Sequence, residues 1–192
     1  MKRLVLASSS PRRAELLRVL GIAFDIVPTD IDESRRPDEH PHGYVERLAR
    51  EKAESATVSL GTVVLAADTA VVHEGEVLGK PGHPAEARTM LARLAGEVHH
   101  VVTGVAVAGV EDGRLEVESV VESARVRMAA LTEEEIAAYV ATGEPLDKAG
   151  AYALQGRGGL LVESVEGHPT TIVGLPLPAT RRLLARRGVE IG

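Results

Sequence analysis

Residues 4–17 run Leu4-Val5-Leu6-Ala7-Ser8-Ser9-Ser10-Pro11-Arg12-Arg13-Ala14-Glu15-Leu16-Leu17, and this stretch indicates how the fold begins. A short apolar run bounded by turn residues is typical of a buried strand, and the leucines after the proline recur with helical spacing. Proline suits the first turn of a helix, where a backbone N–H has no helical partner, and the serine before it suits the N-cap. The stretch therefore predicts a strand over 3–7, a serine-rich turn and a helix over 11–20.

Two arginines stand at the start of this predicted helix. The first turn of a helix has free N–H groups and partial positive charge, so Arg12 and Arg13 oppose the helix dipole instead of stabilising it. The same arrangement suits a bound anion, above all phosphate. A capped helix with two solvated arginines explains these residues equally well when the stretch is taken alone.

The composition argues against several classes of protein. The chain has 192 residues, of which 44% are hydrophobic, enough for a substantial core. Its net charge of −6 and its 2% aromatic content argue against a broad nucleic-acid surface and against base-stacking platforms. No apolar segment approaches the roughly 20 residues that span a membrane, and the first apolar run is too short for a signal peptide. We therefore expect a cytoplasmic protein with no nucleic-acid or membrane partner and, because Cys is absent, no disulfide or thiolate zinc site.

Helical and strand patterns alternate along the chain without strict βαβ regularity. This pattern predicts an α/β fold, a mixed sheet with helices packed on it, in a single folding unit over residues 1–192. The further predicted elements are an acidic loop over 28–41, a helix over about 42–57, a β-rich run over 62–72, a helix over 84–94, paired strands over 97–109 and 115–127, a helix capped by Thr132, a glycine-rich loop over 150–159, a strand over 160–165 and a helix over 178–187.

Asp68 stands inside an apolar strand pattern. A carboxylate is costly to bury unless it is paired or bound to a metal, and the small neighbours Ala66 and Ala70 on the same strand face leave room for a ligand. The alternative is an Asp that accepts backbone hydrogen bonds at a strand end. Glu33, in the acidic loop, is a candidate second carboxylate for Mg²⁺, although a solvated loop explains it as well.

Two lysines and one glutamine complete the candidate residues. Lys80 lies between Gly79 and Pro81, in a rigid turn where an ammonium can neutralise phosphate. Lys52 is either a surface lysine on the predicted helix or a cation of the site. Gln155 is the only glutamine in the chain, and its amide can donate and accept at once, as a pyrimidine imide requires. This inventory suits a metal-bound nucleotide, although neither a P-loop nor a dinucleotide fingerprint is present.

A set of short segments occurs in a characteristic order along nearly the whole chain: Ala7–Arg13, Glu33, Leu48-Ala49, Lys52-Ala53, Ala67–Thr69, Gly79–Pro81, Val102–Val105, Asp147–Tyr152, Gln155-Gly156 and Gly174–Pro176. The set resembles the Maf family of nucleoside triphosphate pyrophosphatases. The resemblance implies an elongated α/β fold like that of inosine triphosphate pyrophosphatases, with two lobes around a cleft. It also implies hydrolysis of nucleoside triphosphates to the monophosphate and pyrophosphate, a divalent metal (Mg, Mn or Co), a homodimer and a link to septum formation.

Two positions resemble one branch of this family. Arg12 after the proline and Gln155 look like the branch that hydrolyses dTTP and UTP, whereas the branch for methylated GTP, UTP and CTP tends to have Trp and Glu there. A nucleotide-binding regulator of cell division with little turnover, and a pyrophosphatase for modified or damaged nucleotides, stay open as alternatives. By this resemblance the site comprises Asp68, Lys52 and Lys80 as catalytic residues, Glu33 and Asp68 as metal ligands, and Ser8, Ser10, Arg12, Arg13, Thr69 and Gln155 as substrate-binding residues.

Overall fold

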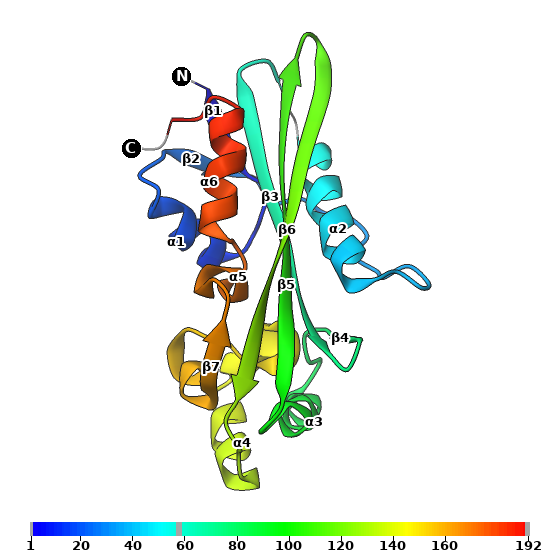
Figure 1. Cartoon of the computed structure of the whole chain (residues 1–192), viewed down its shortest axis with the longest axis vertical. Coiled ribbons are helices and arrows are strands. Elements are labelled where there is room, and N and C mark those ends of the chain that lie inside the picture. Colours follow the sequence, from blue (N-terminus) through cyan, green and yellow to red (C-terminus); the bar gives the residue numbers. More distant parts are fainter. Residues whose placement is uncertain (1, 57–58, 191–192) are drawn as a thin grey trace. The chain divides into compact units, whose positions relative to one another are not determined.

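The computed structural model describes residues 2–56 and 59–190 of the chain. In this part of the chain the strands form one mixed sheet of seven strands in the order β2-β1-β3-β5-β6-β7, with β4 paired to β3 (Figure 1). β1 pairs in parallel with both β2 and β3, whereas β4 and β7 are antiparallel to β3 and β6. The strands are β1 (Arg3–Leu6), β2 (Phe24–Ile26), β3 (Thr62–His73), β4 (Glu76–Leu78), β5 (Val98–Glu111), β6 (Arg114–Met128) and β7 (Val162–Glu166).

The helices begin where the capping residues predict. Ser10 accepts a hydrogen bond from the backbone N–H of Arg13, and Thr132 forms a full capping box with Glu135. No helix in the described residues is long and apolar enough to cross a membrane. The α-helices are α1 (Pro11–Arg18), α2 (Pro41–Ser55), α3 (Pro84–Leu94), α4 (Glu133–Val140), α5 (Pro169–Val173) and α6 (Leu177–Arg186).

The prediction of a mixed sheet flanked by helices is confirmed, but two segments differ from expectation. The predicted loop over 150–159 overlaps two short 3₁₀ turns, η2 (Ala149–Ala151) and η3 (Gly156–Leu161), and a third, η1 (Glu144–Asp147), precedes it. The short helix α5 was not expected, since five residues are too few to show a helical period. Residue 57, the end of the predicted helix over 42–57, lies outside the described residues.

The chain divides into two compact units. Unit 1 comprises residues 1–68, 103–122 and 174–192, and unit 2 comprises residues 69–102 and 123–173. The boundaries fall within β3, β5 and β6, so each of these strands contributes residues to both units. The prediction of a single domain over 1–192 stays a prediction.

The strands of unit 1 bury both faces. On one face, leucines and valines of β1, β3 and β5 pack against α1 and α6; on the other, mostly alanines pack against α2 (Figure 1). The alternation follows from the strand period of two residues, which places Leu65 and Ala67 on the first face and Ala66 on the second. Asp68 therefore shares its face with Ala66, toward α2, as its position in the strand predicts.

Gly104 on β5 allows α2 to lie very close to the sheet. A Cβ built on Gly104 would lie 2.6 Å from the carbonyl carbon of Val45 and 2.9 Å from the backbone nitrogen of Glu46. Only glycine accommodates this contact without moving the helix. Together with the alanines of this face, it fixes α2, and with it the side chains α2 directs toward β3.

Unit 2 has its own core, formed by the remaining halves of the long strands with α3, α4 and the 3₁₀ segments. Its largest buried members include Leu91, Leu94, Met128 and Tyr152. Tyr152 donates or accepts a 2.7 Å hydrogen bond with the buried Nε2 of His99, and the two rings meet edge to face. His99 thus has a structural role in the core of unit 2.

Candidate active site

The turn between β1 and α1 is organised around the side chain of Arg13. Its Nε donates to the carbonyl oxygen of Gly174 at 2.9 Å, and one terminal nitrogen lies 3.3 Å from Oγ of Ser8. The same Ser8 oxygen accepts from the backbone N–H of Ser10 at 3.2 Å. Ser8, Ser10 and Arg13, which the sequence assigns to substrate binding, are thus brought together in one hydrogen-bonded turn at the start of α1.

The charges around this turn are mixed in sign. Burial lowers the pKa of Arg13, Arg12 lowers it further, and Asp68 and Glu33 oppose this change. Both carboxylates therefore act electrostatically on Arg13. No acidic residue stands in the first turn of α1, so the positive end of the helix dipole and Arg12 concentrate positive charge there.

Lys52 contacts both candidate metal ligands, Asp68 and Glu33. Its Nζ lies 2.7 Å from a carboxylate oxygen of Asp68 and 2.6 Å from a carboxylate oxygen of Glu33. Lys52 is 7% exposed and Asp68 9% exposed, so this ion pair is largely shielded from water. The sequence left Lys52 open between a surface lysine and a cation of the site; its burial against two carboxylates excludes the surface alternative.

The loop that bears Glu33 is fastened to α2 by two side chains that sequence reasoning missed. The hydroxyl of Tyr44 donates to the carbonyl oxygen of Glu33 at 2.9 Å, and Arg47 donates to the carbonyl oxygen of Ser34 at 3.1 Å. Tyr44 and Lys52 are eight residues apart on α2 and so share one helix face. That spacing is a signal by which Tyr44 could have been found.

A second ion pair holds the same loop. Arg47 binds both carboxylate oxygens of Glu39, at 2.6 and 2.9 Å. The hydrogen bond from Arg47 lowers the pKa of Glu39 to about 2. Bidentate contact of this kind is the stronger geometry for an arginine and a carboxylate, so Glu39 anchors the loop that presents Glu33.

Glu33 and Asp68 suit a divalent cation. Both already lie within contact distance of one positive group, the Lys52 ammonium, so the two carboxylates converge on a common cation position. Magnesium is commonly held by one or two carboxylates together with substrate phosphates. Among residues 2–56 and 59–190 there is no group of three or more His, Cys, Asp or Glu that could hold a metal ion.

The remaining predicted residues belong to unit 2. Lys80 is exposed, in a turn where the carbonyl oxygen of Gly79 accepts from the N–H of Gly150 at 3.0 Å. Gln155 is exposed immediately before η3, and Thr69 follows Asp68 along β3. Within unit 2 the structure thus brings the Lys80 turn beside the segment that leads to Gln155.

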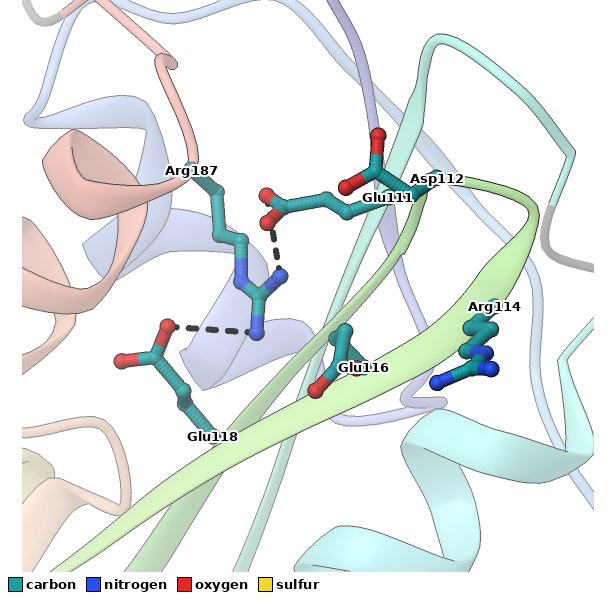
Figure 2. A pocket seen from close by; sticks show the side chains of 6 residues that line it. All are labelled: Glu111, Asp112, Arg114, Glu116, Glu118 and Arg187. Carbon is teal, nitrogen blue, oxygen red and sulfur yellow. Dashed lines mark ion pairs between the residues drawn. The ribbon is translucent and has the colours of Figure 1, made fainter.

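A hollow of about 490 Å³ elsewhere in unit 1 has a different character (Figure 2). Its acidic lining surrounds Arg187, which is 4% exposed and pairs with Glu111 at 3.0 Å and Glu118 at 3.1 Å. Because these contacts join α6 to the β5–β6 hairpin, we assign Arg187 to stability and not to the site.

Comparison with known proteins gives the family. The model of the family described as "Maf-like protein" matches residues 3–187. The chain belongs to the Maf-like family. The resemblance found in the sequence is therefore confirmed over nearly the whole chain.

Curated relatives of this Maf-like chain are similar over their full lengths. A protein of Anaeromyxobacter sp. (strain Fw109-5), named dTTP/UTP pyrophosphatase, is 56% identical and covers 97% of this chain and 90% of its own. A protein of the same name from Methylobacillus flagellatus is 52% identical and covers 100% and 96%. Among solved structures, the Ham1 protein of Staphylococcus aureus covers 97% of this Maf-like chain and 100% of its own, with a TM-score of 0.52 and 15% identity. That likeness concerns the fold alone.

Proposed function

We propose that this Maf-like chain hydrolyses dTTP and UTP to the nucleoside monophosphate and pyrophosphate, with the help of a divalent cation. The observation that supports this most is the charged cluster in unit 1, in which buried Lys52 contacts both the buried Asp68 and the more exposed Glu33. Asp68 and Glu33 also act electrostatically on Arg13 at the start of α1. The names of the curated relatives support the same activity and the same two substrates.

In this proposal the triphosphate is bound by the start of α1. Arg12 and the positive end of the α1 dipole neutralise phosphate oxygens, while Ser8 and Ser10 orient them. Arg13, held by Ser8 and Gly174, keeps the turn in shape and adds positive charge. The roles of Thr69, Lys80 and Gln155 rest on the family resemblance: Lys80 neutralises phosphate, Thr69 contacts the nucleotide, and the Gln155 amide hydrogen-bonds to the base.

The carboxylates then provide the chemistry. Glu33 and Asp68 would hold the divalent cation, which supplies positive charge against the phosphates and acidifies water. Asp68 accepts a proton from the attacking water as the new bond to the α-phosphorus forms. The bond from the α-phosphorus to the oxygen that bridges it to the β-phosphorus breaks, and that oxygen leaves with pyrophosphate. Lys52 stabilises the negative charge that develops on the phosphates.

Pyrophosphate release from a panel of nucleoside triphosphates tests the proposal. The panel contains dTTP, UTP, CTP, dGTP and ITP, each with Mg²⁺, Mn²⁺ or Co²⁺. We expect turnover of dTTP and UTP well above that of the others. Binding of nucleotides without turnover would support the regulator alternative, and a preference for ITP would support the alternative of modified nucleotides. A homodimer, a cytoplasmic location and a link to septum formation stay predictions.

A further inference from the structure

Glu144 was not identified from the sequence, yet its carboxylate accepts three hydrogen bonds, two of them from the turn that follows Gln155. It begins η1, directly after Gly143, whose φ of 74° turns the chain at the end of α4. One carboxylate oxygen accepts from the N–H of Gly158 at 3.0 Å and from the hydroxyl of Tyr139 at 3.0 Å. The other accepts from the N–H of Arg157 at 3.1 Å. Burial raises the pKa of Glu144, but these three hydrogen bonds outweigh it, so the pKa lies below its usual range.

The backbone that follows Gln155 lies against the Glu144 carboxylate. Gly156 has φ +76°, and a Cβ built there would lie 2.9 Å from one Glu144 oxygen. Gln155 therefore precedes a turn in which Arg157 and Gly158 donate N–H groups to the Glu144 carboxylate, and in which a side chain on Gly156 would collide with that carboxylate. Because the backbone that bears Gln155 is fixed, its exposed side-chain amide can reach only a limited set of positions.

We propose that Glu144 is the positioning residue for Gln155 and thereby sets the preference for uracil and thymine over cytosine. This inference rests on the proposed function, in which the Gln155 amide hydrogen-bonds to the base. Uracil and cytosine differ at position 4, an oxo group against an amino group, and at N3, a donor against an acceptor. A correctly held amide complements only one of these patterns. A loosely held amide can rotate to satisfy either, so the preference falls.

The test compares UTP with CTP, because they share the ribose and triphosphate. In Glu144→Gln the side chain keeps its size, but an NH₂ group replaces one acceptor and faces a backbone N–H. We expect the ratio of kcat/KM for UTP to that for CTP to fall by about 10-fold or more, mainly through KM for UTP. Glu135→Gln is the matched control: Glu135 also accepts a backbone N–H, from Thr132 at 2.8 Å, but caps α4. It should lower the unfolding temperature without changing the ratio.

Two further variants separate positioning from simple support of the fold. In a Gln155→Ala background, adding Glu144→Gln should leave the UTP-to-CTP ratio unchanged, since the two residues act as one unit. Should Glu144→Gln fail to fold, Gly156→Ala disturbs the same turn from the other side and should lower the ratio in the same direction.

The outcomes distinguish the inference from the function on which it rests. The inference is supported if the wild type prefers UTP and the UTP-to-CTP ratio of kcat/KM falls in Glu144→Gln or Gly156→Ala only while Gln155 is present. It is overturned if the wild type prefers UTP but this ratio is unchanged in these variants, or falls equally when Gln155 is absent. Wild-type protein with no preference for UTP overturns the proposed function and this inference together.

Discussion

The ammonium of Lys52 on α2 lies 2.7 Å from the carboxylate of Asp68 on β3, and both side chains are largely buried. A buried charge is tolerated when a partner compensates it, so each of these residues depends on the other. Glu33 adds a third charge at 2.6 Å from the same ammonium. The cluster thus combines a cation with two carboxylates, one more negative charge than the lysine neutralises.

Asp68→Asn removes the proposed base and keeps the size of the side chain. We expect pyrophosphate release from dTTP to fall by roughly 10²–10⁴-fold, as loss of a general base does. Far-ultraviolet circular dichroism should be that of the wild type, because the Asn oxygen still accepts from Lys52. Near-full activity of this variant would contradict the role of Asp68.

Lys52→Met tests whether the ammonium occupies the position of a cation between the carboxylates. Without it Glu33 and Asp68 repel each other, so the unfolding temperature in the absence of metal should fall. Addition of Mn²⁺ should then raise that temperature more in the variant than in the wild type, because bound ligand stabilises the folded state. Equal shifts on Mn²⁺ addition in both proteins would show that the carboxylates do not converge on a metal.

Tyr44→Phe removes one hydrogen bond, the 2.9 Å bond to the backbone of Glu33. We expect the metal concentration for half-maximal activity to rise by about 10-fold, in the range seen for groups that orient metal ligands. The free energy of unfolding should fall by only about 1 kcal/mol. An unchanged metal dependence would mean that the Arg47–Glu39 pair alone holds the loop.

Gly104→Ala forces α2 away from β5. The added methyl group meets the Val45 backbone, which cannot rotate aside, so we expect a loss of about 1–3 kcal/mol in the free energy of unfolding. Activity should fall as well, because the shift separates Lys52 from Asp68. Gly43→Ala on the same helix is the control: nothing lies within 4 Å of its added Cβ, so it should stabilise by roughly 0.5–1 kcal/mol. Denaturant titration measures both.

The pH dependence of stability follows from His99. Burial, with smaller effects of His73 and His100, lowers its pKa from 6.5 to about 4. Between these pH values His99 is protonated in the unfolded chain but neutral in the folded chain. The free energy of unfolding therefore falls as the pH decreases from about 6.5 to about 4. The full loss is on the order of 3 kcal/mol.

His99→Gln should abolish most of that slope, whereas His100→Gln, at the exposed neighbouring position, should retain it. Chemical unfolding at pH 7 and pH 5 measures the difference. A slope that is the same in His99→Gln and the wild type would show that other groups cause the acid sensitivity.

Local signals in the sequence were sufficient to predict the helix starts and the strand face that position the site. Ser10 and Thr132 cap their helices as predicted because capping depends on residues within one turn. The face of Asp68 follows from the strand period. The partners of Lys52 could not be predicted, since Glu33 lies in a loop without periodicity and meets α2 through tertiary contacts. Glu144 could not be identified from the sequence either, because its contacts are also tertiary. Its partners Arg157 and Gly158 are 13 and 14 residues away in a segment rich in glycine.

Turnover of dTTP in ¹⁸O-labelled water tests the central claim most directly. Attack at the α-phosphorus, as proposed, places the label in dTMP and leaves pyrophosphate unlabelled, and Asp68→Asn should slow the formation of both products by roughly 10²–10⁴-fold. Label in pyrophosphate, or dTDP and phosphate as the products, would contradict the proposed reaction.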